Sequence, residues 1–573
     1  MRIKVEASRG ARHIFDEDEL NVAYSCFAAG VWGGCCALKS PVERQRYIAS
    51  QGIKGVILHT ARGQSRSHKA CGEARERRRE RRSSPGHRCA PDALQSNVVP
   101  AALRTFVIQS TITGLSPSPV HVSHRGFVRC AFHPLETLYH DVHRATSSCV
   151  ECIEVEGGAS LRGTVQLSGS KNASLPMLCA ALLAQGDHVF RSVPRLRDIA
   201  STLKLLRHLG CRSEVVQSTQ SDVINLSVGD VLGAEAPYEL VCEMRASVLV
   251  LGPLLARLGR AKVSLPGGCA IGTRPIDQHL KGLEALGARV QLHHGYVDCE
   301  APGGRLRGGD VCFDMVTVTG TENLLAAATL AEGRTRLLNA AREPEVVALA
   351  TMLKAMGARI SGEGTSEIVI EGVEALQAAS YEVPPDRIEA GTYMVAAALT
   401  GGDLTLEDAP LAQLEALTSA LRKAGAAVEA LGPSRCRVTR SGPLRPVSLT
   451  TAPYPEFATD MQAQWMVLMT QARGESTISE RIFENRFMHV PELGRLGAQL
   501  SVDGDTATVT GPTPLEGAVV TATDLRASAC LVLAGLVAHG VTRIRRVYHL
   551  DRGYDDLVGK LNGVGARLRR VRE

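Results

Sequence analysis

The hydrophobic positions along the chain follow a repeat. Six amphipathic stretches end alike, with a glycine and then a short segment that continues the apolar pattern, as in LEALGAR and LKAMGAR. Glycine commonly adopts the left-handed conformation directly after a helix, so each stretch predicts a helix, its terminal glycine and a short strand. The glycines are 77, 70, 68, 72 and 68 residues apart, which indicates a repeat architecture filling residues 151–573. They are Gly210, Gly287, Gly357, Gly425, Gly497 and Gly565.

Each repeat also contains a helical segment of a second kind, such as SKNASLPMLCAALLAQG or LRASACLVLAGLVAHG. These segments are apolar on nearly every side, so we expect them to be buried helices. Their polar residues gather at the N-terminal end, where each begins with a charge. The six charged residues are Lys171, Arg245, Glu322, Arg387, Asp460 and Arg526.

Four of these six charges are positive, which opposes the helix dipole. The conflict disappears if an anion binds there, because the free N–H groups of a helix start already favour a negative charge. The pattern therefore predicts that several helix starts converge on a ligand with several phosphates or carboxylates. The alternative is ordinary surface charge at helix starts.

Residues 1–150 differ from the rest of the chain in composition. They carry 22 Lys and Arg against 12 Asp and Glu, a net charge of +10, whereas the whole chain has +6. They hold seven of the sixteen cysteines at irregular spacings and show little periodicity. We expect a basic, disordered extension, or a chain start placed too far upstream. The alternative is a basic arm that docks on RNA, an anionic membrane or a partner protein.

The sequence predicts neither a metal site nor a membrane span. His140 and His143, followed by Cys149 and Cys152, have spacings that suit zinc, but Cys152 is expected to open the first strand of the repeat region. We therefore expect no metal site. No apolar run reaches the ~18 residues of a membrane span. The composition favours a cytoplasmic protein whose core binds no nucleic acid.

The stretch LPGGCAIGTRPIDQH, Leu265 to His279, places a thiol among glycine and proline. Such a composition fits neither a helix nor a strand interior, so we expect a mobile loop that carries Cys269. Arg274 follows five residues later, and nearby cations lower the pKa of a thiol. A lone loop cysteine is more often inert, so these residues alone leave its role open.

Several motifs together resemble one family. SGSKNASLP, MRASVLVLGPL, LPGGCAIGTRPID, AAREPE, PDRIEAGT, TDMQAQ, FENRFMH, ATDLRAS and HLDRGY are similar to the UDP-N-acetylglucosamine 1-carboxyvinyltransferases, a family of enolpyruvyl transferases. The resemblance covers residues 151–573 in one register and leaves out residues 1–150. The related 5-enolpyruvylshikimate-3-phosphate synthases share a lysine after Gly-Ser. They also have a Gly-Asn-Ala-Gly-Thr stretch, which this chain lacks, and no such loop cysteine.

The resemblance implies the fold. It is a two-domain inside-out α/β barrel built from six βαβαββ repeats, with helices inside and sheets outside. The implied bounds are 151–170 plus 385–573 for the domain that contains both ends of the fold, and 171–384 for the domain that carries Cys269. The chain would cross between the domains near Lys171 and return near Asp386.

The resemblance also implies a reaction. The enolpyruvyl group of phosphoenolpyruvate moves to the 3-hydroxyl of UDP-N-acetylglucosamine, and phosphate is released, as the first committed step of peptidoglycan synthesis. The reaction proceeds by addition and elimination through a tetrahedral ketal and needs neither a metal nor a cofactor. The alternatives are a 5-enolpyruvylshikimate-3-phosphate synthase-like transferase and a non-catalytic binding protein of the same fold.

Site residues follow from the matched motifs. Cys269 is implied as the general acid, as the site of a covalent phosphoenolpyruvate adduct and as the target of epoxides such as fosfomycin. Asp460 is implied as the base, with a helix cap as its alternative role. The residues implied to act on or bind phosphoenolpyruvate are Lys171, Asn172, Arg274, Arg486, Arg526 and Arg552. Those implied for the nucleotide sugar are Asn172, Arg245, Arg274, Pro275, Ile276, Asp277, Gln278, Met315, Val316, Thr317, Val318, Asp460 and Ile482.

Overall fold

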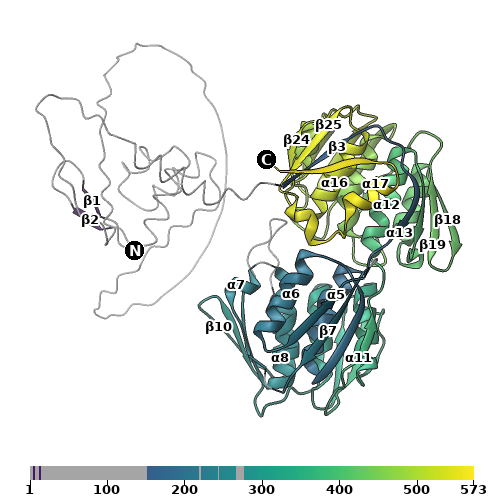
Figure 1. Cartoon of the computed structure of the whole chain (residues 1–573). Helices are drawn as coiled ribbons and strands as arrows, with labels where there is room; N and C mark the ends of the chain where they lie inside the picture. Colours follow the sequence, from purple (N-terminus) through teal and green to yellow (C-terminus); the bar gives the residue numbers. More distant parts are fainter. Residues whose placement is uncertain are drawn as a thin grey trace, which may run out of the picture. The chain divides into compact units, whose positions relative to one another are not determined.

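The structure, a computed structural model, describes residues 151–218, 221–230, 232–242, 244–265 and 276–572. It also describes the backbone of two short strands, β1 (Lys4–Glu6) and β2 (Arg12–Ile14), which pair antiparallel. The chain divides into two compact units, Met1–Ala131 and Phe132–Glu573, and the second contains all of the repeats. In Figure 1 the colours follow the described residues along the sequence.

Six four-stranded sheets account for the strands of residues 151–572, one for each repeat. In every sheet the first strand is parallel to the second, and the third and fourth follow antiparallel. Three sheets have the orders β16 (Ser380–Glu382), β5 (Gly186–Val193), β7 (Asp222–Val228), β6 (Arg212–Val216); β8 (Glu235–Ala236), β9 (Arg260–Ser264), β11 (Tyr296–Glu300), β10 (Arg289–His293); and β12 (Asp310–Cys312), β13 (Arg334–Leu338), β15 (Glu367–Glu371), β14 (Arg359–Ser361).

The other three sheets repeat this arrangement with strands from both ends of the described region. Their orders are β4 (Arg162–Gln166), β17 (Asp403–Glu407), β19 (Arg435–Thr439), β18 (Ala427–Gly432); β20 (Leu449–Thr450), β21 (Gly474–Ser479), β23 (Thr506–Gly511), β22 (Gln499–Asp503); and β24 (Val519–Thr521), β25 (Val541–Arg545), β3 (Glu151–Glu156), β26 (Arg567–Arg572). Strand β3 contains Cys152 and pairs with both β25 and β26, which confirms the predicted first strand of the repeat region.

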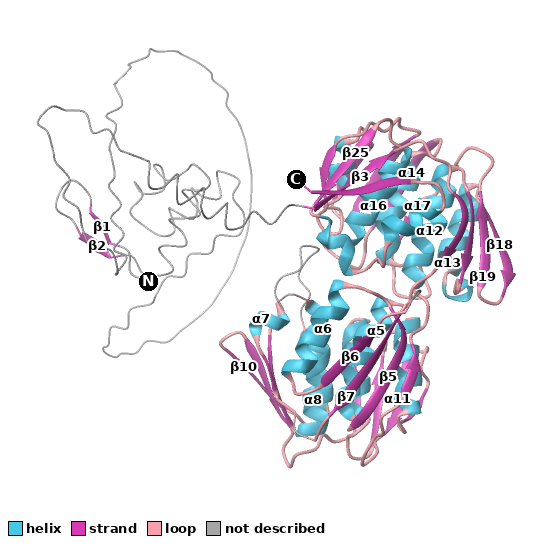
Figure 2. Ribbon diagram, in the orientation of Figure 1, coloured by secondary structure: helices cyan, strands magenta, loops and turns pink. Residues whose placement is uncertain are grey.

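The predicted buried helices are all present, and nearly every residue in them is buried because no side of them is polar. In Figure 2 these helices lie inside and the strands lie outside. The buried segments are α5 (Lys171–Ala180), η2 (Arg245–Val250) with α8 (Leu251–Leu258), α10 (Val318–Ala328), α12 (Arg387–Thr400), α14 (Gln462–Thr470) and α16 (Leu525–Val537).

The second helix of each repeat ends at the predicted glycine. All six glycines have φ between 84° and 104°, the left-handed conformation that a residue with a Cβ rarely adopts. The helices are α6 (Arg197–His208), α9 (Asp277–Ala285), α11 (Pro344–Ala355), α13 (Glu415–Ala424), α15 (Val490–Arg495) and α17 (Leu557–Gly563). The shorter elements are η1 (Ala181–Leu183), α7 (Tyr238–Val241), η3 (Leu411–Gln413), η4 (Thr459–Met461) and η5 (Val547–Arg552).

The buried apolar side chains form two separate hydrophobic cores. One is built from residues between Ala173 and Val383, and we call this part the insert lobe. The other combines residues 153–167 with residues 388–568, and we call it the terminal lobe because it contains both ends of the described region. The enolpyruvyl transferase fold expected from the sequence is therefore present.

The chain passes between the lobes twice, through two segments that run side by side. Ser170 N donates to Pro384 O over 2.7 Å, and Asp386 N donates to Ser168 O over 2.9 Å. A Cβ at Gly169 would lie 1.8 Å from Ser192 O, so only glycine fits at this point. The exact domain bounds at 170/171 and 384/385 stay a prediction.

Candidate active site

The first cluster of charges joins the two lobes around Asp198. Lys171, the first residue of α5, places its Nζ 2.9 Å from Asp198 Oδ2. Arg552, at the end of η5 in the terminal lobe, donates from Nε to Asp198 Oδ1 over 2.8 Å and from Nη2 to Oδ2 over 3.3 Å. Asp198 lies in the first turn of α6, with a side chain only 4% exposed. Two cations predicted to bind phosphoenolpyruvate are thus held by one buried carboxylate.

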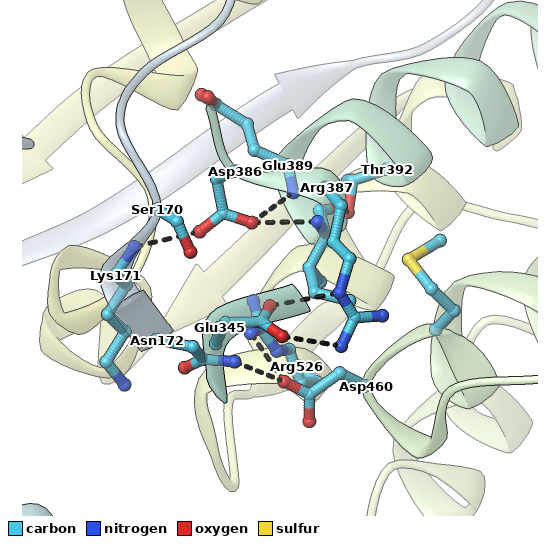
Figure 3. Close-up of polar contacts among 12 residues, drawn as sticks. Ser170, Lys171, Asn172, Glu345, Asp386, Arg387, Glu389, Thr392, Asp460 and Arg526 are labelled. Carbon is cyan, nitrogen blue, oxygen red and sulfur yellow. Dashed lines mark hydrogen bonds and ion pairs between the residues drawn. The ribbon is translucent and has the colours of Figure 1, made fainter. Parts of the chain in front are cut away.

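The second cluster surrounds Asp460 within the terminal lobe. Arg486 Nη2 donates to Asp460 Oδ1 over 2.9 Å, and Arg526 Nη2 donates to Oδ2 over 2.7 Å. Both arginine side chains are 4% exposed, whereas that of Asp460 is 25% exposed. Asn172 Nδ2, from the insert lobe, lies 3.5 Å from Asp460 Oδ2, as Figure 3 shows. These four residues, matched separately in the sequence, therefore meet in one place.

The arginines determine the charge state of Asp460. Burial favours the neutral acid, but Arg526 and Arg486 outweigh it and hold the pKa of Asp460 well below its ordinary value. Burial also lowers the pKa of Lys171, which Asp198 opposes and Arg526 and Arg552 reinforce. Lys171 is followed directly by Asn172, whose Nδ2 lies 3.5 Å from Asp460 Oδ2, so the two clusters lie close together.

Arg387, the first residue of α12, and Glu322, the fifth residue of α10, belong to a further group of buried charges around Glu345. Arg387 donates from Nε to Glu345 Oε1 over 3.0 Å and from Nη2 to Glu345 Oε2 over 3.2 Å, which links α12 to α11 (Figure 3). Burial raises the pKa of Glu322 well above its ordinary value, and Glu345 and Glu343 reinforce this effect. Arg387 and Arg526 are both buried, so the alternative of ordinary surface charge is wrong for them.

Helix starts in this region are capped by side chains other than those predicted to act in catalysis. Asp386 caps α12 through Ile388 N and Glu389 N and also accepts from Lys171 N over 3.1 Å. Asp460 lies in η4, and neither η4 nor α14 has a side-chain hydrogen bond from its N-cap residue. The alternative role of Asp460 as a helix cap is therefore not supported.

Residues predicted to bind the nucleotide sugar come together from two chain segments. Gln278, near the start of α9, donates from Nε2 to Asp314 Oδ2 over 3.1 Å, and Asp314 N donates to Gln278 Oε1 over 2.9 Å. This pairing holds the start of α9 beside the segment that leads into α10, which Thr317 caps through Gly320 N. Met315 is 62% exposed, Ile276 is buried and Asp277 is exposed. Val316, Val318, Arg245 and Ile482 are half-buried.

Some predicted residues lie outside the described part of the chain. These are Cys269, Arg274 and Pro275, together with His140, His143 and Cys149 of the possible zinc ligands. Among the described residues no cluster of His, Cys, Asp or Glu could hold a metal ion, and Cys152 is buried in β3. Within that same part of the chain, no helix has the length and apolar character needed to cross a membrane.

Two polar residues of these contacts were missed by the sequence analysis. Asp198 sits in the first turn of a helix, where an acid is common because it favours the helix dipole, so the sequence holds no signal for its role. Asp314 precedes the matched segment 315–318 by one residue and also pairs with Lys281. Both contribute through partners that lie far away in sequence.

Known proteins with similar sequences share the whole repeat region. The sequence pattern of the EPSP synthase (3-phosphoshikimate 1-carboxyvinyltransferase) family matches residues 155–561. UDP-N-acetylglucosamine 1-carboxyvinyltransferase of Sorangium cellulosum is 59% identical over 74% of this chain and 99% of its own length. The enzyme of that name from Myxococcus xanthus is 56% identical over 73% of this chain and 99% of its own length.

Solved structures agree in fold. The enolpyruvyl transferase NikO from Streptomyces tendae has a TM-score of 0.66 and 28% identity, covering 74% of this chain and all of its own. EPSP synthase from Acinetobacter baumannii, at 19% identity and a TM-score of 0.56 with the same coverage, shares the fold. The sequence identities, the six-repeat fold and the matched motifs lead to one conclusion: the chain belongs to the UDP-N-acetylglucosamine 1-carboxyvinyltransferase family.

Proposed function

We propose that the protein transfers the enolpyruvyl group of phosphoenolpyruvate to the 3-hydroxyl of UDP-N-acetylglucosamine and releases phosphate. The observation that carries this proposal is the pairing of the cations. Phosphoenolpyruvate has two anionic groups, and the site offers two pairs of cations, Lys171 with Arg552 and Arg486 with Arg526. Each pair already holds one carboxylate, which supports its use for an anion of the substrate.

The phosphate is assigned to Lys171 and Arg552, with Arg274 from the cysteine loop, and the carboxylate to Arg486 and Arg526. The guanidinium fork suits both groups because it donates two parallel hydrogen bonds. When the substrate carboxylate takes the arginines, Asp460 loses the partners that hold its pKa low. Asp460 then becomes a stronger base beside the sugar hydroxyl, so its basicity depends on the bound phosphoenolpyruvate.

Addition and elimination each move two protons. In the addition, Cys269 delivers a proton to the methylene carbon while Asp460 takes the proton of the 3-hydroxyl, and a carbon–oxygen bond forms. In the elimination, the Cys269 thiolate left by the addition takes a proton from the new methyl group as the bond to phosphate breaks, and Asp460 gives its proton to the departing phosphate, so the double bond and both residues are restored. A general acid or base in such steps typically contributes ~10² to 10⁴ in rate.

The nucleotide sugar is assigned to the surface where α9 meets the segment before α10. The Gln278 side chain already forms hydrogen bonds with Asp314. We therefore assign the contacts with the nucleotide sugar to backbone groups of residues 276–278 and 315–318. Asn172, Arg245 and Ile482 complete the set. Asn172 lies beside Asp460, which supports a place near the reacting hydroxyl.

Phosphate release from phosphoenolpyruvate tests the function. We expect release that requires UDP-N-acetylglucosamine and yields an equal amount of enolpyruvyl product by mass spectrometry. Shikimate 3-phosphate in place of the nucleotide sugar is expected to give none. Release with shikimate 3-phosphate alone would favour the other branch of the fold family, and no release with either acceptor would favour a binding protein.

Cys269 is tested by its reactivity. We expect fosfomycin to label Cys269 before the other fifteen cysteines once UDP-N-acetylglucosamine is bound, because Arg274 and Lys171 favour the thiolate. Peptide mass mapping after brief labelling gives the order of reaction. Cys242 and Cys312 are exposed free thiols in the same chain and serve as internal controls. Predominant labelling of either control would remove Cys269 from the mechanism.

A further inference from the structure

We propose that Asp198 is a built-in counter-ion for the phosphate-binding cations and that it weakens the binding of the phosphate product. This inference rests on the proposed function and adds a residue to it. Asp198 accepts from Lys171 Nζ over 2.9 Å and from Arg552 Nε over 2.8 Å. These are the two described cations that the proposed function assigns to the phosphate, so a phosphate ion has to share or replace the contacts of Asp198.

The charges of the cluster explain the effect. Lys171 and Arg552 contribute two positive charges, and Asp198 cancels one of them. The positive charge that the phosphate-binding cations, Arg274 included, offer to a phosphate dianion is therefore one unit smaller while Asp198 stays ionised. Burial disfavours the ionised form of Asp198, but Lys171 and Arg552 outweigh it and keep its pKa below the ordinary value. Like charges so close together weaken the bound phosphate.

Asp198 has little freedom to move away. Its side chain is 4% exposed, and its backbone carbonyl accepts from Thr202 Oγ1 over 2.9 Å in the first turn of α6. The side chain of Arg552 is 31% exposed. Phosphate is therefore accommodated by movement of Arg552, while Asp198 remains in place and takes Arg552 back when phosphate leaves.

This arrangement suits the last step of the reaction. The leaving phosphate has to dissociate before the next turnover, and strong binding of the product would limit the rate. When phosphate leaves, the ion pair between Asp198 and Arg552 forms again and replaces the contacts that Arg552 made with phosphate. Asp198 is thus a positioning residue that acts through the two cations and does not itself exchange protons with the substrate.

The test measures the affinity for inorganic phosphate, with the full chain, in the presence of UDP-N-acetylglucosamine. Asp198→Asn keeps the size of the side chain and removes its charge. We expect the dissociation constant of phosphate, from titration calorimetry, to fall by about tenfold or more, which corresponds to about 1.4 kcal/mol. We also expect kcat and the KM for phosphoenolpyruvate to fall together, because product release becomes slower. If Asp198→Asn merely disturbed the structure of the site, phosphate binding would become weaker instead.

Two further variants make the result specific. Asp403→Asn removes the same charge from the exposed pair that Asp403 forms with Arg437, and we expect unchanged phosphate affinity. Asp198→Glu keeps the charge, and we expect an affinity close to that of the unaltered protein. If Asp198→Asn does not fold, tightened phosphate binding by Asp198→Glu already contradicts the proposal.

Unchanged or weaker phosphate binding by folded Asp198→Asn overturns the proposal. This failure is separate from failure of the proposed function, because calorimetry with phosphate needs no turnover. If the unaltered protein releases phosphate from phosphoenolpyruvate while Asp198→Asn binds phosphate normally, only the role of Asp198 is lost. If the unaltered protein shows no turnover, the calorimetric result still decides the role of Asp198 toward the anion.

Discussion

The two charge clusters have the same composition, one carboxylate and two cations, but opposite patterns of burial. Around Asp198 the carboxylate is buried, at 4% exposure, and its partner Arg552 is 31% exposed. Around Asp460 the two arginines are buried, at 4% each, and the carboxylate is 25% exposed. Both clusters pair one carboxylate with two cations. The clusters differ in whether the carboxylate or the arginine is the more deeply buried side chain.

This difference teaches how each cluster would exchange its carboxylate for an anion of the substrate. A buried side chain is held by its neighbours, whereas a more exposed one can change rotamer at lower cost. We therefore expect the arginines around Asp460 to stay in place while Asp460 turns away, which would free the proposed base. Near Asp198 we expect the cation to move and the acid to stay, which would keep a negative charge beside the phosphate. In these proposals, one cluster prepares the reaction and the other favours release of its product.

The largest effect is expected for Asp460→Asn. The amide cannot take the proton of the sugar hydroxyl, so we expect kcat to fall by ~10²-fold or more, as for the loss of a general base. The measurement is the rate of phosphate release by purified protein, with the melting temperature recorded beside it. Asp505→Asn, in the exposed pair with Arg481, is the matched control and is expected to leave kcat unchanged. Near-normal turnover of folded Asp460→Asn would exclude Asp460 as the base.

Replacement of one arginine in each cluster by lysine separates buried from exposed cations. Arg526→Lys and Arg552→Lys each lose the two-pronged donor, and we expect the KM for phosphoenolpyruvate to rise by about tenfold, since a hydrogen bond to a charged group contributes about 1.5–3 kcal/mol. Only Arg526→Lys is expected to lower the melting temperature clearly, because its site is buried. Equal thermal losses in both variants would contradict the contrast between the clusters.

The pH dependence of the melting temperature distinguishes the ionised carboxylate of Asp198 from the neutral amide in Asp198→Asn. The pKa of Asp198 is lowered in the folded protein, so its contribution to stability is present above the pKa of the unfolded chain, about 3.9, and is lost as pH falls through the folded value. We expect Asp198→Asn to melt below the unaltered protein at pH 7. The gap is expected to shrink as the pH falls below about 4. Melting curves from pH 7 to 3 test this, and a gap that widens in acid would contradict it.

The smallest effect is expected on removal of residues 1–150. Both clusters are formed by residues between Lys171 and Arg552, and β3 begins at Glu151, so the truncated chain keeps every contact described for them. We expect turnover and melting temperature close to those of the full chain. The truncation has to spare β3, because this strand pairs with β25 and β26 inside its sheet. Loss of most activity would show that residues 1–150 contribute to the enzyme.

Much of the fold was predictable because its signals are local. A helix that ends in glycine depends on a few neighbouring residues, and all six glycines have the expected positive φ. The buried helices were predicted from their apolar sides, and the first strand was expected to begin at Cys152, within the observed β3. The matched motifs brought Asp460, Arg486 and Arg526 into one hypothesis, and the structure places them in hydrogen-bond contact. The roles of these residues stay predictions.

The sequence by itself determined the six repeats, the buried helices and the charged residue at the start of each, because periodicity and helix capping act over a few residues. Only the tertiary structure decided the partners of those charges. Asp198 meets Arg552 from 354 positions away, and Asp460 meets Arg526 from 66. The physical reason is that an ion pair depends on the packing of separate elements, whereas an acid in the first turn of a helix is favourable whatever it faces. The role inferred for Asp198 therefore became visible only when the two lobes were seen together.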